Sequence, residues 1–290
     1  MNPASRGGRS QGCFERIHKL FGNIDYDFEY TENMDHATEL SRRANEKGYD
    51  VVVAIGGDGT INRVLNGFYD NRSCCDMGKS CRAKFGVIHT GTSPDFCKHY
   101  GIPLDIDSAV DVLKKGESRK IGVGRVEFGD RVRYFACCLN VGLGAELANN
   151  ANSGIRRKVG DKLGTFLSLL KTLKTYKPID IMVNGEKLTN LYNLSVGKTY
   201  YVASGLKIKN DLHDGDDRFY LCTAQGFTMK HIWKMYTGMD LGVSYAEKIK
   251  IEGEGMFDLD GDAEGSLPCT VSPAEKLELI STLTGKEGDA

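Results

Sequence analysis

The 290-residue sequence contains no uninterrupted apolar run of about 18 residues, the length that indicates a membrane-spanning helix. The first residues, Met1 to Gly12, are polar and lack the apolar segment of a secretory signal peptide. A strong excess of either charge is also absent, because the formal net charge is -1. This balance argues against a protein that binds nucleic acid over a large surface. We therefore expect a cytoplasmic protein without a nucleic-acid partner.

A disulfide framework is missing as well. The nine cysteines are odd in number and follow no regular spacing, so we expect reduced thiols. Cys74, Cys75 and Cys81 cluster in a polar stretch. Their spacing matches no zinc pattern and a second pair of ligands is lacking, which favours a loop insertion over a metal site.

The first part of the chain alternates helical and strand patterns, which predicts an open α/β sheet in a domain spanning residues 1–117. The expected elements are a helix over Phe14–Phe21 stopped by Gly22, a strand over Tyr26–Thr31, a helix capped by Asp35 with Ala37, Leu40 and Ala44 inside and Gly48 at its end, a buried strand over Val51–Ile55, a helix burying Ile61, Val64, Leu65 and Phe68, a strand over Phe85–Ile88, and a helix over Asp107–Lys115 ended by Gly116.

Strand patterns dominate after residue 117 and predict a mostly-β second domain, a sandwich or flattened barrel, over residues 118–290. Asn184-Gly185 lies between two such runs and is a strong hairpin signal. The expected strands are Lys120–Phe128, Val132–Val141, Ile179–Val183, Leu188–Val196, Asp217–Ala224, Lys248–Ile251, Met256–Leu259 and Leu277–Ile280, with helical segments near Val159–Tyr176 and Thr228–Met239.

A glycine-rich turn, Gly56-Gly57-Asp58-Gly59-Thr60, follows the buried strand and opens the next helix. Ligands of parallel α/β sheets bind beyond the carboxyl ends of the strands. Glycines in such a turn let phosphate groups approach backbone N–H groups, and Thr60 can cap the helix. The turn matches neither the dinucleotide fingerprint nor a Walker loop with its lysine.

Asp58 is the informative residue of this turn. A carboxylate beside phosphates would repel them unless it engages Mg²⁺, directly or through water. An aspartate can equally cap a tight turn. The local sequence leaves both interpretations open.

The segment Val51–Gly67 closely resembles the nucleotide loop of the diacylglycerol kinase-like lipid kinases, a superfamily that includes sphingosine and ceramide kinases and, more distantly, NAD kinases and phosphofructokinases. The resemblance spans nearly the whole chain. Further matching segments are Asn2–Gly8 with the family's Asn-Pro-x-Ser-Gly opening, Thr31-Glu32 and His36-Ala37 with its next motif positions, Gly91–Phe96 with its Gly-Thr-Gly-Asn-Asp-Phe loop, Arg157–Pro178 with its helix before a hairpin, and Asp262-Ala263-Glu264 with its Asp-Gly-Glu.

The resemblance implies an enzyme that uses ATP and Mg²⁺ and phosphorylates a lipid hydroxyl, with diacylglycerol giving phosphatidic acid. It assigns Asp58 and Asp95 to the nucleotide and metal side, and makes Glu264 the general base with Asp262 beside it. A carboxylate suits this task because an alcohol is a poor nucleophile. The implied nucleotide-binding positions are Asn2, Ser5, Thr31, Gly56, Gly57, Asp58, Gly59, Thr60, Gly91 and Thr92.

A second acidic group lies in the segment Asp211–Asp217, whose dense oxygen atoms suit Mg²⁺ or Ca²⁺. The glutamate spacing of an EF-hand is absent. The segment resembles the family's acidic loop, which holds a structural Mg²⁺ in some members, and the implied ligands are Asp211, Asp214 and Asp216. A solvated turn is the equal alternative.

A basic stretch interleaved with leucines predicts the lipid-facing part of the molecule. Such an amphipathic helix can rest on anionic headgroups, which would place the protein peripherally at the inner face of the membrane. The alternative is a helix packed on the β domain with its lysines in water, and a homodimer also stays open. The basic residues are Arg156, Arg157, Lys158, Lys162, Lys171, Lys174 and Lys177.

Three departures from the family pattern bear on activity. The family's first strand normally precedes Asn-Pro, yet Asn2-Pro3 directly follows Met1. Ser93-Pro94 replaces Gly-Asn, which removes an N–H group and an amide. Ala263 replaces a glycine and should reshape the turn that presents Glu264 if that position requires a positive φ.

Two other functions are weighed against the lipid kinase. An NAD kinase-like enzyme is disfavoured because no Asn-Glu dipeptide follows the glycine turn. A non-catalytic nucleotide sensor is disfavoured because Asp58, Asp95 and Glu264 are all retained.

Overall fold

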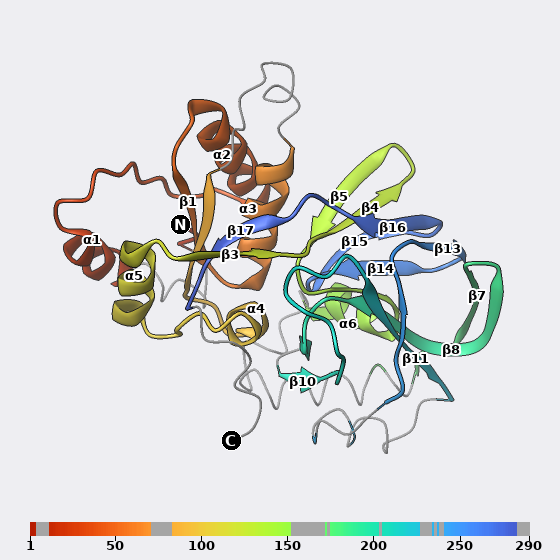
Figure 1. The fold of residues 1–290 in the computed structure, drawn as a ribbon. Coiled ribbons are helices and arrows are strands. Elements are labelled where there is room, and N and C mark those ends of the chain that lie inside the picture. Colours follow the sequence, from red (N-terminus) through yellow and green to blue (C-terminus); the bar gives the residue numbers. More distant parts are fainter. Residues whose placement is uncertain are drawn as a thin grey trace. The chain divides into compact units, whose positions relative to one another are not determined.

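The computed structural model describes residues 1–3, 12–70, 83–151, 172, 175–202, 205–226, 234, 237 and 241–282. The chain divides into two compact units, and Figure 1 shows their elements. The first unit comprises Met1–Ile121 and Lys276–Ala290, and the second comprises Gly122–Glu275.

The first unit is built on a four-stranded sheet with the order β1-β2-β17-β3. β1 (Val51–Gly56), β2 (Lys84–His89) and β17 (Leu277–Ile280) run parallel, and β3 (Ser118–Ile121) closes one edge in the antiparallel direction. The apolar runs predicted as buried strands thus form two neighbouring strands of this sheet, β1 at one edge and β2 beside it, with the apolar character expected of strands covered by helices.

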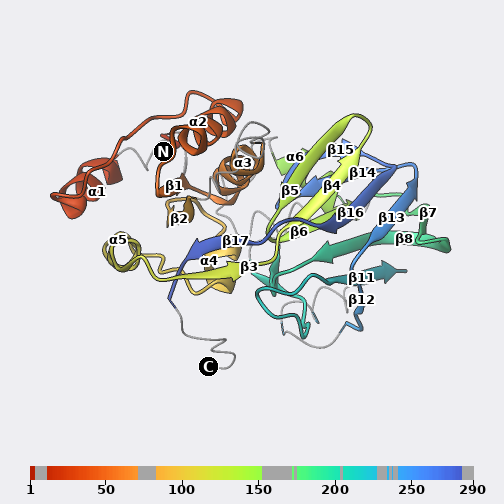
Figure 2. The same ribbon diagram turned by 45° about the horizontal axis from the view of Figure 1, so that its top comes forward.

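Helices pack against this sheet in two pairs. α1 (Phe14–Phe21) lies beside α5 (Ile106–Lys115), and their buried residues Ile17 and Val110 share a core with Ile55 and Ile88 of the sheet (Figure 1). α2 (Met34–Lys47) packs against α3 (Asp58–Tyr69), as both ribbon views show (Figure 2).

The contact between α2 and α3 depends on close approach of the two backbones. A Cβ atom on Gly67 would lie 2.0 Å from the carbonyl oxygen of Thr38, which leaves no room for a side chain. Ser41 Oγ donates a hydrogen bond of 2.7 Å to the carbonyl of Val64 in the same interface. The crossing holds α3, and with it the turn that precedes it, against the sheet.

The ends of these helices were largely predicted from the sequence. Gly48 and Gly116 adopt the left-handed conformation, with φ of 76° and 64°, and end α2 and α5 as expected. The cap of α2 differs from the prediction: Asn33, not Asp35, accepts the backbone N–H of His36. Asn33 has the extended backbone that a capping residue needs, whereas Asp35 already lies in the first helical turn.

The strand expected over Tyr26–Thr31 does not form. This segment runs beside Met1, which donates its amino group to the carbonyl of Glu29 and accepts the N–H of Thr31. Met1 alone offers only these two hydrogen bonds, which are too few to form a β-ladder. The alternating sequence pattern of this segment is therefore not accompanied by a strand.

The second unit is dominated by one eleven-stranded sheet with the order β15-β14-β6-β8-β7-β13-β16-β4-β5 and with β11 and β12 branching from β8. All its pairings are antiparallel. Its strands are β4 (Gly124–Phe128), β5 (Arg131–Phe135), β6 (Cys138–Gly142), β7 (Ile179–Val183), β8 (Glu186–Gly197), β11 (Phe219–Gln225), β12 (Ser244–Ala246), β13 (Ile249–Gly253), β14 (Met256–Leu259), β15 (Asp262–Ser266) and β16 (Cys269–Pro273). The described part of this unit also holds α6 (Leu143–Ala151) and the short pair β9 (Tyr201–Val202) and β10 (Leu206–Lys207).

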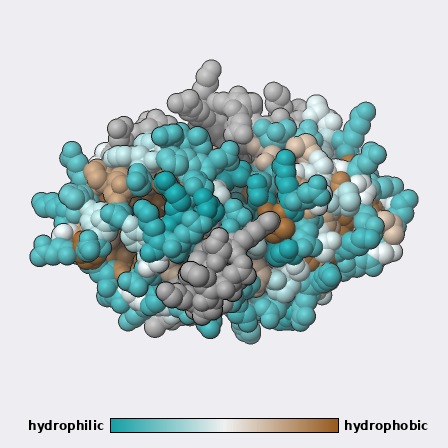
Figure 3. Space-filling model, turned by 90° about the horizontal axis from the view of Figure 1, so that it is seen from above, coloured by the Kyte–Doolittle hydropathy of each residue, from teal (hydrophilic) through white to brown (hydrophobic). Residues whose placement is uncertain are grey.

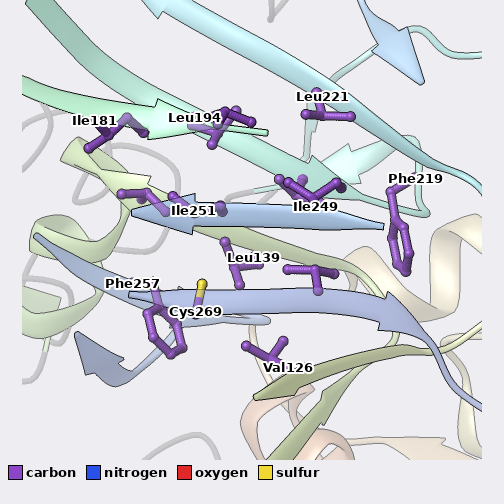
Figure 4. Packing of buried hydrophobic residues seen from close by; sticks show 14 of the residues in the cluster. Val126, Leu139, Ile181, Leu194, Phe219, Leu221, Ile249, Ile251, Phe257 and Cys269 are labelled. Carbon is purple, nitrogen blue, oxygen red and sulfur yellow. The ribbon is translucent and has the colours of Figure 1, made fainter. Parts of the chain in front are cut away.

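The inner face of this sheet encloses a continuous apolar core. Figure 4 shows Ile181, Leu194, Ile251 and Leu139 pointing into it from strands that lie above and below. Each fully buried side chain of this size contributes about 1.5–3 kcal/mol relative to its exposed state. The predicted β-rich half is therefore confirmed, and the hairpin β7–β8 turns at Asn184 and Gly185, whose φ of 50° and 85° match the expected tight turn.

The ends of the second unit differ from the boundary expected at residue 117. The run predicted as one strand over Lys120–Phe128 is divided between β3 in the first unit and β4 in the second. β17 returns to the first unit, where it pairs with β2 and β3. A pattern of buried residues predicts a strand but not the sheet that the strand joins. The sequence therefore gave no indication that β3 and β17 belong to the first unit.

The surface seen in Figure 3 is mostly hydrophilic, with apolar residues in small separate patches. Over the residues that the structure describes, no helix combines the length and apolar character needed to cross a membrane.

Candidate active site

The glycine turn joins β1 to α3 without an intervening loop. β1 ends at Gly56, Gly57 occupies the N-cap position, and α3 begins at Asp58. Thr60, expected as the cap, instead lies inside the first turn of α3, where its side chain covers Gly56. A Cβ atom on Gly56 would lie 2.5 Å from Thr60 Cβ, so the turn requires glycine there.

The opening Asn-Pro segment lies against this turn. Asn2 donates its backbone N–H to the carbonyl of Ile55 and its side-chain amide to Thr60 Oγ1, at 2.9 and 3.0 Å. Thr31, buried to 8% exposure, is held beside it through the carbonyl of Met1. Three of the residues implied by the resemblance, Asn2, Thr31 and Thr60, therefore lie close together, whereas Ser5 lies outside the described residues.

A second loop meets the glycine turn at the end of the neighbouring strand. β2 ends at His89, and α4 (Asp95–His99) begins after Gly91, Thr92, Ser93 and Pro94. Thr90 donates its N–H to the carbonyl of Gly56 at 2.8 Å. A Cβ atom on Gly91 would lie 2.3 Å from Gly57 Cα, so the two loops touch backbone to backbone.

This contact brings together the two aspartates assigned to the nucleotide side. The backbone N–H of Asp95 donates to Asp58 Oδ2 at 3.1 Å. Asp95 is buried to 6% exposure, and the Asp58 side chain keeps 14%. Burial, reinforced by the charge of Asp58, raises the pKa of the Cys97 thiol. Asp58 at the start of α3 and Asp95 at the start of α4 are thus neighbours at helix N-termini, where phosphates and a cation could bind.

His89 belongs to the same cluster and was missed in the sequence. Its Nε2 atom lies 3.1 Å from the carbonyl oxygen of Ser93 and 3.7 Å from Asp58 Oδ1. The available signal was its place: it is the last residue of a buried strand, directly before a motif loop. A lone histidine at such a position gave no other indication of a role.

The carboxylates implied as the general base and its neighbour lie in the second unit, on β15. Glu264 forms an ion pair with Arg133, whose Nε donates to Glu264 Oε1 at 2.7 Å, and the Glu264 side chain is only 7% exposed. Asp262 directly follows the turn of the β14–β15 hairpin.

The backbone of this hairpin shows which glycine the turn requires. Asp260 and Gly261 form the two-residue turn with φ of 52° and 90°, whereas Ala263 lies within β15 and has no positive φ. The replacement of glycine by Ala263 therefore does not strain the turn. The sequence Asp260-Gly261-Asp262 is itself an Asp-Gly-acid motif, and its glycine has the conformation that favours glycine.

Two further acids of this hairpin, Asp258 in β14 and Asp260 in the turn, were not singled out in the sequence. Asp260 accepts the backbone N–H groups of Ala136, Cys137 and Cys138 at 3.1, 2.9 and 2.9 Å. Asp258 Oδ1 accepts from Asn140 Nδ2 and from the N–H of Gly261. Burial raises the pKa of Asp258 to about 7.

Replacing Asp258 by asparagine is expected to remove a pH-dependent loss of stability. The pKa of Asp258 is higher in the folded chain than in the unfolded one. The contribution of protonated Asp258 to the free energy of unfolding is therefore complete below about pH 4 and is lost as the pH rises to about 7. Relative to Asp258→Asn, the wild type should lose roughly 3 kcal/mol of unfolding free energy over this range. Urea unfolding at pH 4.5 and pH 7.5 measures the change, and parallel pH profiles would contradict it.

The acidic segment Asp211–Asp217 is organised by cationic side chains. Arg218 pairs with both carboxylate oxygens of Asp216, with a shortest distance of 2.7 Å, and this pairing lowers the pKa of Asp216 to about 2. The buried Lys198 donates Nζ–H to the carbonyls of Asp216 and Arg218 at 2.8 and 2.9 Å.

The metal site expected on this segment does not fit these contacts. Within the ranges that the structure describes, no three acid, histidine or cysteine side chains gather as metal ligands. Asp211, Asp214 and Asp216 are therefore not brought together, and the guanidinium of Arg218 occupies the oxygens of Asp216 that a metal would need.

Removing divalent metal is expected to leave the thermal stability of the nucleotide-free protein unchanged, because Lys198 and Arg218 supply the positive charge here. Lys198→Met should instead lower Tm by about 4–10 °C, since hydrogen bonds from a charged donor are lost. Thermal unfolding with EDTA and with added Mg²⁺ measures both effects, with the exposed Lys209→Met as the matched control. A large EDTA-induced decrease in wild-type Tm would contradict this account.

Several predicted features lie outside the described residues. They are the cysteine group Cys74, Cys75 and Cys81, most of the basic stretch from Arg156 to Lys174, and most of Thr228–Met239.

Comparisons with known proteins agree with the resemblance seen in the sequence. Residues 1–126 match the family model of the diacylglycerol kinase catalytic domain. Curated relatives include a diacylglycerol kinase of Staphylococcus aureus (strain bovine RF122 / ET3-1), 29% identical over 85% of this chain and 78% of the relative, and one of Staphylococcus saprophyticus, 28% identical over 82% and 78%.

Solved structures share the fold of the whole chain. A Bacillus anthracis str. Sterne protein, provisionally assigned as a diacylglycerol kinase, is 21% identical, with a TM-score of 0.74 over 97% of this chain and 95% of its own. A further diacylglycerol kinase structure from that organism covers 92% of both chains with a TM-score of 0.64 and 20% identity. The family model, which covers residues 1–126, and the relatives confirm the resemblance to the diacylglycerol kinase-like lipid kinases that the sequence shows.

Proposed function

We propose that this chain transfers the γ-phosphoryl group of ATP to the hydroxyl group of a lipid, with diacylglycerol as the acceptor and phosphatidic acid as the product. The observation that carries this proposal is the contact between the glycine turn and the Gly91–Asp95 loop, which places Asp58, the first residue of α3, beside Asp95, the first residue of α4. Phosphoryl transfer depends mainly on positioning and charge neutralisation, and this arrangement suits both.

The nucleotide side of the proposed reaction uses backbone and carboxylate groups. The start of α3 has backbone N–H groups that no carbonyl of the helix accepts and that can bind phosphate oxygens. Gly57 and Gly91 allow the second loop to lie directly against this helix start. The donor set of Asp58 and Asp95 fits Mg²⁺, because carboxylate oxygens are its preferred protein ligands. Mg²⁺ bound there would neutralise phosphate charge that these carboxylates would otherwise repel.

The acceptor side needs a carboxylate that takes the hydroxyl proton. Glu264 and Asp262 are both candidates for this role. The guanidinium of Arg133 occupies one oxygen of Glu264, which weakens that carboxylate as a proton acceptor. We therefore give proton acceptance to Asp262 and assign Glu264 to holding Arg133 beside the hairpin.

Contact with a lipid surface is part of this proposal. The basic stretch from Arg156 to Lys177 contains seven cationic residues in the sequence, and each cation near an anionic surface contributes about 1 kcal/mol to binding. The rate with micellar diacylglycerol should accordingly rise when anionic lipid is added and fall when salt is added.

An ADP-release assay with a panel of acceptors tests the function. The purified chain, ATP and Mg²⁺ are combined with diacylglycerol or a sphingoid base in mixed micelles, or with NAD in solution. We expect release with diacylglycerol and none with NAD. Asp262→Asn should reduce the rate about 10²–10⁴-fold, whereas Glu264→Gln should reduce it less. Turnover with NAD alone would reject the lipid acceptor, and the opposite order of the two variants would return the base to Glu264.

A further inference from the structure

His89 stands at the junction of the two loops of the nucleotide site. It is the last residue of β2, and its side chain is only 5% exposed. A polar ring so fully buried costs free energy unless it is hydrogen-bonded, so its contacts indicate what it does there. None of the roles implied by the family motifs falls on this residue.

One ring nitrogen of His89 faces both loops. The carbonyl oxygen of Ser93 can only accept a hydrogen bond, so His89 Nε2, 3.1 Å away, must carry the proton. The same nitrogen lies 3.7 Å from Asp58 Oδ1. The proton-bearing edge of the imidazole is thus directed at the Gly91–Asp95 loop and at the carboxylate of the glycine turn.

The contact with Ser93 falls where this chain departs from the family motif. Ser93-Pro94 stands in place of Gly-Asn, so an amide side chain is missing and Pro94 has no N–H to donate. The carbonyl that His89 holds belongs to the Ser93–Pro94 peptide itself. His89 therefore supplies a polar contact at the point where the substitution removes two.

Other bonds fix the same loop on either side. Thr90 donates its N–H to the carbonyl of Gly56, and Asp95 donates its N–H to Asp58 Oδ2. The bond from His89 to Ser93 lies between these two in the sequence. Together the three bonds define the path of the backbone around Gly91, which touches Gly57.

We propose that His89 is a positioning residue for the nucleotide: it holds the Ser93 carbonyl and faces Asp58, and so keeps both loops in the geometry that accepts the phosphates of ATP. The proposal rests on the proposed function for the identity of the ligand. It predicts that the Nε2–H donor, and not the bulk of the ring, is what ATP binding requires.

Three substitutions separate the donor from the bulk. His89→Gln can place an amide N–H near the position of Nε2, His89→Asn is too short to do so, and His89→Leu removes the donor while keeping an apolar side chain. His99→Leu is the matched control, because His99 lies in α4, where its ring contacts the ring of Tyr100. Thermal unfolding of each variant establishes that it is folded.

Calorimetric titration with Mg²⁺-ATP, without lipid, is the test. We expect His89→Leu and His89→Asn to raise Kd at least about tenfold, and His89→Gln and His99→Leu to stay within about threefold of wild type. In turnover, KM for ATP should rise and KM for the lipid should not. A wild-type Kd in His89→Leu, or equal damage in the glutamine and asparagine variants, would overturn the proposal. If the leucine variant does not fold, the comparison of glutamine with asparagine still decides.

The outcomes for the two proposals differ. Wild-type protein that binds ATP but phosphorylates no lipid would reject the proposed function, and the Kd series would still test His89. Wild-type protein that binds no ATP would reject both.

Discussion

Asp58→Asn is expected to reduce phosphoryl transfer about 10³-fold or more while leaving the fold intact. Asparagine has nearly the same size as aspartate, and its side-chain oxygen can still accept the N–H of Asp95, which Asp58 Oδ2 accepts at 3.1 Å. The variant therefore keeps the contact between the loops. It loses the negative charge that the proposed Mg²⁺ needs, and electrostatic groups of this kind contribute about 10²–10³-fold or more to rates.

The matched control for this experiment is Asp70→Asn, the same change at the other end of α3, where the residue is exposed. Initial rates of ADP release at saturating ATP and diacylglycerol measure the effect, and thermal unfolding establishes that both variants are folded. A wild-type rate in Asp58→Asn would indicate that Asp58 only caps the turn, which is the alternative that the sequence left open.

Gly91→Ala is expected to abolish measurable ATP binding, with an increase in Kd of at least about 100-fold. The added Cβ atom would lie 2.3 Å from Gly57 Cα, a backbone atom that cannot rotate away, so the two loops must separate. Separation moves Asp95 away from Asp58 and opens the phosphate-binding backbone. The loss of ATP binding should exceed the loss of stability, because the displaced groups follow the carboxyl ends of β1 and β2 and do not belong to the apolar core.

Two other glycines calibrate this result. A Cβ atom on Gly57 would lie 3.1 Å from Gly91 Cα, so Gly57→Ala should weaken ATP binding less than Gly91→Ala. Gly12 has nothing within 4 Å of the added atom, and Gly12→Ala should leave Kd unchanged. Calorimetric Kd values in the order Gly12, Gly57, Gly91 would support the contact, and equal values for all three would reject it.

The sequence predicted the elements around the glycine turn well because their signals are local. A continuous apolar run, a glycine turn and a helical stripe each depend on neighbouring residues, and β1, the turn and α3 formed where expected. Parallel pairing of β1 with β2 then brings Asp58 and Asp95 together, since their motifs follow adjacent strands. His89 was not predicted as a site residue, because a single buried histidine produces no periodic pattern in the sequence.

Long-range pairings account for most of what the sequence could not provide. The strand over Leu277–Ile280 was predicted, but its place between β2 and β3 depends on partners about 160 and 190 residues away. The raised pKa of Asp258 is likewise due mainly to burial within the folded sheet, which no local pattern reveals.

The metal prediction on Asp211, Asp214 and Asp216 had a different weakness. A cluster of acidic residues predicts a metal site only if no Lys or Arg side chain of the protein already binds the same oxygen atoms. Arg218 is adjacent to the acidic segment in the sequence, but Lys198 follows the distant strand β8. Its contact with the segment therefore depends on the fold.

Transfer of labelled phosphate to diacylglycerol tests the central claim most directly. The purified chain is incubated with γ-labelled ATP, Mg²⁺ and mixed micelles of diacylglycerol, beside Asp58→Asn, and the lipid fraction is separated by chromatography. We predict labelled phosphatidic acid with the wild type and at most about one thousandth of that rate with Asp58→Asn. Unlabelled lipid, recovered from wild-type protein that is folded and binds ATP, would contradict the assignment of this chain as a diacylglycerol kinase.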